Sequence, residues 1–342
     1  MLFKILWFLM LWLVVVVPIL IAVAYFTLVE RKILGSIQRR RGPNVIGFWG
    51  VLQPLSDGFK LLIKEIILPS SSNKILFIIA PFITFVLSLI NWVLIPITAS
   101  SAITQVSLSI LFLFASSSLG VYGVLISGWA SNSKYAFLGS LRSAAQMLSY
   151  EISLGFILII FFLYTGSLDL ISIVLVQENF WFAIFAPSLF AIFFTIALAE
   201  TNRHPFDLPE AEAELVSGYN VEYSAMNFAL FSLGEYSNML VMSSLNVLFF
   251  FGGWYPPNFV SNFFISNFDF FALFWLEIFI NSFFFSLKLS FFVLLYIFMR
   301  AALPRYRYDQ LMDLGWKIFL PISLIFLLFN LMLLSSFNIL PA

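Results

Sequence analysis

Five ionisable side chains interrupt long apolar stretches of this sequence, and they are the first candidates for chemistry: Glu151, Glu200, Glu235, Glu277 and Lys288. A charged group inside a lipid bilayer is costly, so such residues usually face a bundle interior or a water-filled cavity and mark a route for ions or protons. A buried carboxyl group beside another carboxyl has neutral and charged forms of similar energy near pH 7, and it can then carry protons. The alternative is that each group only fixes helix packing through hydrogen bonds. Four glutamates and a lysine together favour a proton path.

The most acidic segment of the chain, residues 200–222, lies between two apolar stretches. Its carboxylates are Glu200, Asp207, Glu210, Glu212, Glu214 and Glu222. A solvated acidic loop would be the simplest interpretation, but the segment also carries Phe206 and Tyr219, which favour burial. It lies on the same predicted face as the basic loops of the chain. We therefore expect the segment to dock against those basic loops.

Membrane-spanning helices must position these charges. Of the 342 residues, 62% are hydrophobic and 10% are charged, whereas roughly a quarter are charged in an ordinary soluble domain, so a soluble fold is excluded. A helical crossing takes about 20 apolar residues, and the runs lack the alternation of barrel strands. We predict an all-α polytopic membrane protein, with residues 1–342 forming a single membrane domain of eight transmembrane helices. The apolar runs lie at 5–28, 75–97, 104–129, 146–166, 180–199, 224–251, 271–299 and 317–337.

Basic residues in the short loops predict how the helices are oriented, because loops rich in Lys and Arg stay on the side from which helices are inserted. The Lys and Arg residues between the apolar runs fall in four loops: 29–74, 130–145, 200–223 and 300–317. The intervening loops carry none, so basic and uncharged loops alternate. This alternation predicts an even number of helices with both termini on the outer side. The first run is far longer than the core of a signal peptide and is expected to be the first span.

The first basic loop, residues 29–74, contains an amphipathic pattern. Its apolar residues recur at helical spacing: Leu52, Leu55, Phe59, Leu62 and Ile66. Polar residues occupy the opposite face: Asp57, Lys60 and Lys64. The pattern predicts a helix lying along the membrane surface. Such a helix either floors a cavity or only anchors the loop to the bilayer.

The chain has no cysteine and one histidine. It therefore lacks a conventional ligand set for an iron–sulfur cluster and cannot give a haem two histidines. We expect no metal site and no redox centre in this chain, so any electron carrier must belong to a partner.

Two stretches, residues 30–54 and 199–223, carry long ordered motifs. The first begins with Glu30-Arg31-Lys32, and the second begins with Ala199-Glu200-Thr201-Asn202-Arg203. Supporting stretches lie at 131–135, 141–151 and 300–311. Together they closely resemble the subunit 1 family of respiratory complex I, the proton-pumping NADH:ubiquinone oxidoreductase, in its mitochondrial form. The resemblance covers most of the chain.

The resemblance implies a place where the membrane arm of that complex meets its peripheral redox arm. There the subunit would form the membrane part of a narrow chamber for the substrate ubiquinone. The family positions that border the chamber correspond to Arg31, Leu52, Leu55, Phe59, Phe206, Tyr223, Phe228 and Arg300. The family's chain of membrane glutamates corresponds to Glu151, Glu200, Glu210, Glu212, Glu222 and Glu235. These glutamates are expected to connect quinone chemistry to proton translocation.

The resemblance also implies partners and a location. The partners would be the peripheral-arm subunits that complete the chamber and carry the iron–sulfur clusters and FMN, and other membrane-arm subunits. No nucleic acid is expected. The family places the chain in the mitochondrial inner membrane as a multi-pass protein, and a bacterial plasma membrane is the other possibility. Its enzymatic role is that of a subunit of the respiratory chain's proton-translocating NADH:ubiquinone reductase.

Two other functions stay open at this point. The equivalent membrane anchor of an energy-converting hydrogenase would share the glutamates and the fold but would not use quinone. A stand-alone proton or cation antiporter would also need charged helices, although the basic face and the acidic segment favour docking to partners. Two positions depart from the family pattern: His204 stands where relatives often have a small residue, and Ser116 to Ser118 stand where some relatives have an acid.

Overall fold

The protein is helical throughout the part that the computed structural model describes, namely residues 2–98, 106–207, 218–257 and 270–337. Within these ranges the backbone forms helices, turns and connecting segments and no strand. The side chains of residues 2–11 and 270–277 lie outside the description. The prediction of an all-α fold is confirmed for the described residues.

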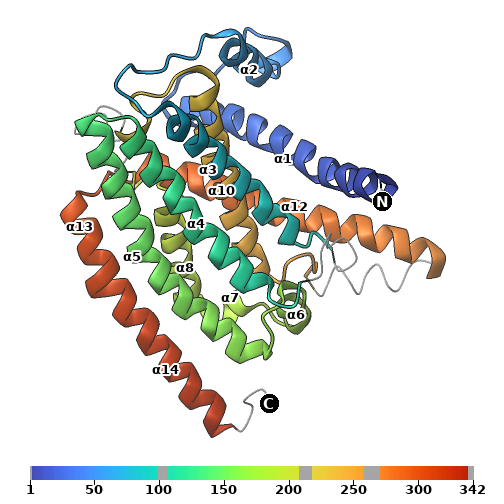
Figure 1. The fold of residues 1–342 in the computed structure, drawn as a ribbon. Coiled ribbons are helices and arrows are strands. Elements are labelled where there is room, and N and C mark those ends of the chain that lie inside the picture. The colour runs from blue at the N-terminus through green and yellow to red at the C-terminus, as the bar shows by residue number, and fades with distance from the viewer. Residues whose placement is uncertain (1, 99–105, 208–217, 258–269, 338–342) are drawn as a thin grey trace.

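Five helices stand side by side and form the body of the molecule (Figure 1). They are α3 (Lys74–Leu94), α4 (Ser109–Ala130), α5 (Lys134–Thr165), α8 (Pro187–Glu200) and α10 (Ala225–Phe250). Helix α10 is the most enclosed of them, and each of its residues from Met239 to Phe250 is buried. Its far end packs into an aromatic cluster, where Phe249 stacks on Phe161 of α5 at 4.8 Å between ring centroids. The core therefore follows α10.

The remaining long helices lie outside this body. Helices α1 (Leu2–Ile37) and α12 (Phe270–Ala302) both pack against α10 and also touch each other. Helix α14 (Leu320–Ser336) runs along α5 on the opposite side of the body (Figure 1). Short elements connect the long ones: α6 (Leu170–Val176), α7 (Phe182–Phe185), the 3-10 turns η1 (Phe48–Gly50) and η2 (Gly218–Asn220), α13 (Tyr308–Asp313) and the π-helical turn η3 (Leu314–Phe319).

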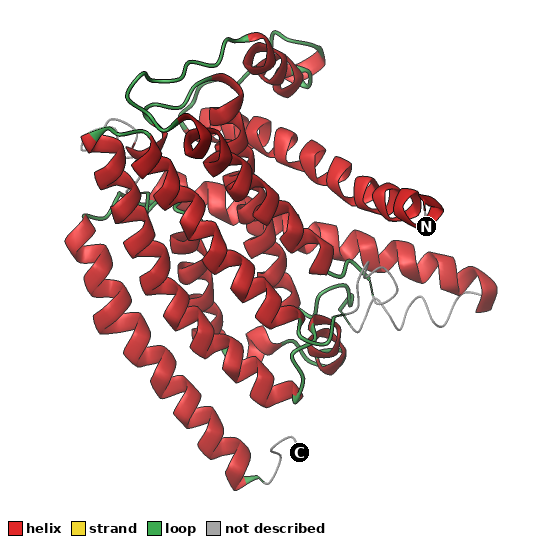
Figure 2. Ribbon diagram, viewed as in Figure 1, coloured by secondary structure: helices red, strands yellow, loops and turns green. Residues whose placement is uncertain are grey.

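Helix α2 (Gln53–Ile63) forms where the amphipathic pattern predicted it. Pro54 stands in its first turn, where the missing amide hydrogen costs nothing. The helix lies across one end of the body, beside α1 and α10, within a long looped segment (Figures 1 and 2). Its apolar residues Leu55 and Phe59 are exposed.

Six helices are long and apolar enough to cross a membrane, counted over the described residues. They span Trp12–Ile37, Lys74–Leu94, Ser109–Ala130, Lys134–Thr165, Ile278–Ala302 and Tyr308–Ser336. The other two predicted runs differ for separate reasons. Helix α10 is long but carries polar residues that include Glu235, Asn238 and Asn246, which lower its hydropathy. The run 180–199 is divided, because Pro187 disfavours a helical Ala186 and Ala186 takes φ −130°, ψ 62°.

Candidate functional site

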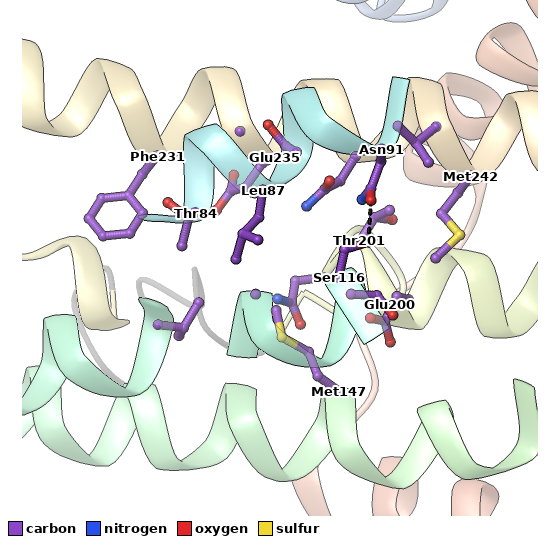
Figure 3. A pocket seen from close by; sticks show the side chains of 18 of the residues that line it. Thr84, Leu87, Asn91, Ser116, Met147, Glu200, Thr201, Phe231, Glu235 and Met242 are labelled. Carbon is purple, nitrogen blue, oxygen red and sulfur yellow. Dashed lines mark hydrogen bonds between the residues drawn. The ribbon is translucent and has the colours of Figure 1, made fainter. Parts of the chain in front are cut away.

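The main site is a polar cavity of about 80 Å³ enclosed by α3, α4, α5, α10 and the end of α8. It has room for a few water molecules. Figure 3 shows Glu235 projecting from α10 and Glu200 from the end of α8, with Asn91 and Ser116 between the helices. Other polar lining residues are Thr84, Ser88, Ser117, Thr201, Asn202, Tyr219 and Asn238. The structure thus brings two of the predicted proton-path glutamates to one cavity.

Hydrogen bonds organise only part of this cavity. Ser116 donates to the side-chain oxygen of Asn91, and Tyr219 donates to the carboxylate of Glu235. Buried oxygen atoms of Glu200 and Asn202 receive no hydrogen bond from the described residues. Polar atoms left over at a cavity wall are suited to bind water and to exchange protons with it. Ser116, which departs from the acidic family pattern, is therefore part of the cavity wall.

Glu151 lies on α5 close to the cavity but outside its lining. It is buried, one of its carboxyl oxygens has no partner among the described residues, and its charge acts on Glu200. Two like charges held in a region of low dielectric constant oppose each other's ionisation. Glu151 and Glu200 are therefore electrostatically coupled.

Helix α5 also fixes the chain that follows Glu200. The amide nitrogen of Gln146 donates to the carbonyl oxygens of Ala199, at 2.8 Å, and Phe206, at 2.9 Å. One turn later, the hydroxyl of Tyr150 donates to the carbonyl of Leu311 at 2.9 Å. These residues recur at i, i+4 and so share one face of the helix. This face therefore ties the end of α8 and the α13 region to α5.

The described part of the acidic segment docks against a basic one. Asp207 is buried and lies 3.3 Å from the guanidinium of Arg305 and 3.1 Å from the imidazole of His204. The ring of Phe206 stacks on Tyr306 at 5.6 Å. The docking predicted for this segment is confirmed at Asp207. His204 faces this ion pair, with 19% of its side chain exposed.

A close contact between α5 and η2 positions Tyr219 at the cavity. A Cβ atom at Gly139 of α5 would lie 2.7 Å from the Cα atom of Gly218, which is too close for any side chain. The glycine therefore allows η2 to press against α5. That approach positions the neighbouring Tyr219 beside Glu235.

A second charged cluster surrounds Glu30 near the end of α1. Arg300 of α12 donates to the Glu30 carboxylate, Tyr236 of α10 donates to it at 2.6 Å, and a guanidinium nitrogen of Arg203 lies 3.9 Å away. The guanidinium of Arg203 also lies 4.5 Å from the ring centroid of Tyr236. Glu30 is only 5% exposed. A buried carboxylate needs such compensation, since an unpaired one is strongly destabilising.

Sequence reasoning did not select Glu30, Arg203 or Tyr236 as site residues, although it did select Arg300. One signal was available, because Glu30 directly follows the first apolar run and a carboxylate there needs a cation. Nothing in the spacing indicated which cation, since Arg203 and Arg300 both lie in distant parts of the sequence.

The predicted chamber residues fall into two groups. The first group is exposed and lies on α1, on α2 or directly before it, and on α10: Arg31, Leu52, Leu55, Phe59 and Phe228. Arg31 pairs with Asp57 of α2 at 2.7 Å. The others contact neighbouring side chains: Phe206 and Tyr223 are buried, against Tyr306 and in a stack with Phe77 at 4.0 Å, and the partly exposed Arg300 pairs with Glu30. Burial raises the pKa of Tyr223.

Of the remaining predicted proton-path residues, Glu222 and Lys288 do not line the cavity, and Glu210 and Glu212 lie outside the described residues. Glu222 is half-buried next to the start of α10. Lys288 of α12 donates to three backbone carbonyls, those of Phe251 at 2.7 Å, Gly253 at 3.0 Å and Tyr255 at 2.7 Å. That segment follows the end of α10, about 24 Å along the helix from Glu235.

We expect replacement of Lys288 by Met to loosen the 251–255 segment without changing proton handling. Buried carbonyls that lose their donor cost about 1–3 kcal/mol each, so the melting temperature of the protein in its membrane complex should fall clearly. Lys317→Met is the control, because Lys317 is exposed and its ion pair is a local one with Asp313, one helical turn away. A changed number of protons moved per electron in Lys288→Met would restore Lys288 to the proton path.

The fold and the site together define a helical protein with six helices suited to cross a membrane, in which two carboxylates, Glu200 and Glu235, share one polar cavity between helices. Proteins that move ions or protons use such an arrangement. The sequence model of the family described as NADH dehydrogenase matches residues 10–331. The chain therefore belongs to that family.

Curated relatives match almost the whole chain. NADH-ubiquinone oxidoreductase chain 1 of Chondrus crispus is 54% identical over 96% of this chain and 96% of its own length. A subunit of the NADH-quinone oxidoreductase of Paramagnetospirillum magneticum is 53% identical over 96% of this chain and 92% of its own. NADH-ubiquinone oxidoreductase chain 1 of Arabidopsis thaliana is 54% identical over 91% of each chain.

Proposed function

We propose that this chain is the membrane subunit of a proton-pumping NADH:ubiquinone oxidoreductase. In that role it forms the membrane part of the quinone chamber and couples quinone reduction to proton translocation through its glutamates. Relatives at about half identity are named as chain 1 of NADH-ubiquinone oxidoreductase or as a subunit of NADH-quinone oxidoreductase. The observation that carries the proposal is that Glu200 and Glu235 share a polar cavity while Glu151 acts electrostatically on Glu200.

The coupling would work through charge. Reducing a quinone with two electrons takes up two protons, which changes the charge beside nearby carboxylates and shifts their protonation together. The residues after Glu200 are fixed to α5 through Gln146 and to the basic segment through Arg305. A movement of this segment would therefore reach Glu200 directly. From there the change would pass to Glu151 and Glu235.

The exposed residues of α1 and α2 are suited to border the chamber. Arg31, Leu55 and Phe59 present a basic and apolar surface that a peripheral-arm partner would cover. Phe206 and Tyr223 would then support this wall from behind, since both are buried. The chamber would also be lined by Leu52, Phe228 and Arg300. The proton path would include Glu210, Glu212 and Glu222, but not Lys288.

The proposed setting is the mitochondrial inner membrane, with a bacterial plasma membrane as the alternative. Relatives from Chondrus crispus and from Paramagnetospirillum magneticum both match the chain. We propose eight crossings, with α10 and the divided run 180–199 added to the six apolar helices, and both termini on the outer side. The partners would be the peripheral-arm subunits that hold the iron–sulfur clusters and FMN, and the other membrane-arm subunits. Ubiquinone would be the substrate.

The two other functions find less support. The family and the names of the relatives oppose a hydrogenase anchor and a stand-alone antiporter. Asp207, at the start of the acidic segment, pairs with Arg305 of the same chain. A partner would therefore bind at the exposed surface of α2 rather than at Asp207.

Labelling with a photoreactive ubiquinone analogue tests the proposed function. In the assembled complex in its membrane, we expect the analogue to label this chain within residues 29–74 or 222–235. Excess ubiquinone should suppress the labelling, because both compete for one chamber. Labelling confined to other subunits, or labelling that ubiquinone leaves unchanged, would contradict the proposal.

A further inference from the structure

Tyr296 is a buried polar side chain that the proposed path does not use. It lies on α12 and is 4% exposed, and the hydrogen-bond partner indicated for its hydroxyl among the described residues is the side chain of Thr201. Its ring packs edge-on against Phe194 of α8 at 5.6 Å between centroids. A hydroxyl group buried among aromatic rings calls for an explanation.

The hydroxyl of Tyr296 adjoins the cavity. It lies beside the side chain of Thr201, and Thr201 lines the cavity between Glu200 and Asn202. The hydroxyl of Thr201 gives its own hydrogen to the carbonyls of Ala197 and Leu198. Its oxygen is therefore left to accept a hydrogen bond from the direction of Tyr296, directly or through water.

The same face of α12 leads on to the second charged cluster. Tyr296 and Arg300 are four residues apart, so they share a helix face and are separated by about 6 Å along the axis. Arg300 binds Glu30, to which Tyr236 also donates. About a third of the Arg300 side chain is exposed, at 31%, so this cluster is in contact with the surroundings of the protein.

The polar groups therefore form a line across a region that is otherwise aromatic. At one end is the cavity with Glu200, in the middle are Thr201 and Tyr296, and at the other end is the partly exposed Arg300. Phe292, one turn earlier on α12, is fully buried and packs against Phe194. On this face of α12, Tyr296 is thus the polar group between Phe292 and Arg300.

We propose that Tyr296 is a proton-relay residue that supplies Glu200 from the side of α1 and α12. A water molecule near Arg300 would give a proton to the Tyr296 oxygen while the Tyr296 hydroxyl gives its own proton to a water molecule held at the Thr201 oxygen, and that water would give a proton to the Glu200 carboxylate. Tyrosine ends the step neutral, as it began. The proton lost by the water near Arg300 is replaced from the surrounding solvent.

This relay rests on the proposed function, because it assigns a route for protons to the same cavity. It gives Arg300 a role besides pairing with Glu30, since the guanidinium would orient the water that gives up the proton. It also explains why a hydroxyl is placed among phenylalanines with the cavity-lining Thr201 as its polar neighbour.

Replacing Tyr296 by Phe in the assembled complex tests the relay. The substitution keeps the ring and removes only the hydroxyl. We expect the rate of coupled quinone reduction to fall several-fold and its solvent deuterium isotope effect to rise, because proton supply to Glu200 becomes limiting. Oxidation of NADH by an artificial acceptor should stay unchanged. The melting temperature should change little, because the ring keeps its packing against Phe194 and Thr201 keeps its hydrogen bonds to the carbonyls of Ala197 and Leu198.

Tyr164→Phe is the matched control. The hydroxyl of Tyr164 donates to the side chain of Asn330 at 2.6 Å and joins α5 to α14, away from the cavity. Its loss should lower the melting temperature and leave the isotope effect unchanged. A Tyr296→Phe variant with normal rate and normal isotope effect would overturn the relay. If Glu200→Gln still abolished translocation in the same experiment, the proposed function would stand and only the relay would fail.

Discussion

Replacement of Glu200 by Gln is expected to abolish proton translocation coupled to quinone reduction. Gln has nearly the same shape as Glu but cannot take up or release a proton. Glu200 lines the polar cavity with Glu235, and Glu151 acts on it from α5. Without its carboxyl group, the cavity would lose the member that links both neighbours. The measurement is the number of protons moved per NADH oxidised in sealed membrane vesicles.

Oxidation of NADH by artificial acceptors should stay intact in Glu200→Gln, because those reactions bypass the membrane arm. Asp313→Asn is the control, since its carboxylate is exposed and forms a local ion pair with Lys317; it should leave translocation unchanged. An unchanged proton yield in Glu200→Gln would refute the role proposed for the cavity.

Replacement of Glu30 by Gln should give the largest loss of stability. Glu30 is the carboxylate between Arg203 and Arg300, and it accepts a hydrogen bond from Tyr236. Removing one partner of a buried ion pair costs about 3–5 kcal/mol, because the opposite charges stay buried without compensation. Here two guanidinium groups would be left facing each other. We expect a lower melting temperature and less assembled complex on native gels.

The ion pair between Arg31 and Asp57 provides the control for this experiment. It joins α1 to α2 at 2.7 Å, but both side chains are substantially exposed. An exposed pair contributes about 0–1 kcal/mol, so Asp57→Asn should melt close to the parent protein. The physical argument would be wrong if Glu30→Gln and Asp57→Asn lost the same stability.

The sequence predicted several features because they depend on local properties. High hydropathy predicted a helical membrane protein, and the spacing of Leu55 and Phe59 predicted α2. The rarity of charge inside apolar runs identified Glu200 and Glu235, which do share a cavity. The motifs beginning at Glu30 and Ala199 indicated the family that the comparison then established.

The number of membrane-spanning helices could not be settled from local properties of the sequence. An apolar run does not show whether one helix continues through it, and the run 180–199 divides at Ala186 because of Pro187. Conversely, polar residues keep α10 out of the six most apolar helices, although it is the most enclosed helix of the body. Its Asn246 is buried and its Glu235 accepts a hydrogen bond from Tyr219, and these contacts are set by the tertiary structure.

The sequence by itself determined that this chain is a helical membrane protein, which family it belongs to and which charges are costly enough to require an explanation. The tertiary structure decided what each charge contacts. It turned Lys288 toward three carbonyls, Glu30 toward Arg300 and Tyr236, and Glu200 toward a shared cavity. The physical reason is that hydropathy and helical spacing act over neighbouring residues. The pairing of buried charges joins residues as far apart in sequence as Glu30 and Arg300, and only the folded packing brings them together.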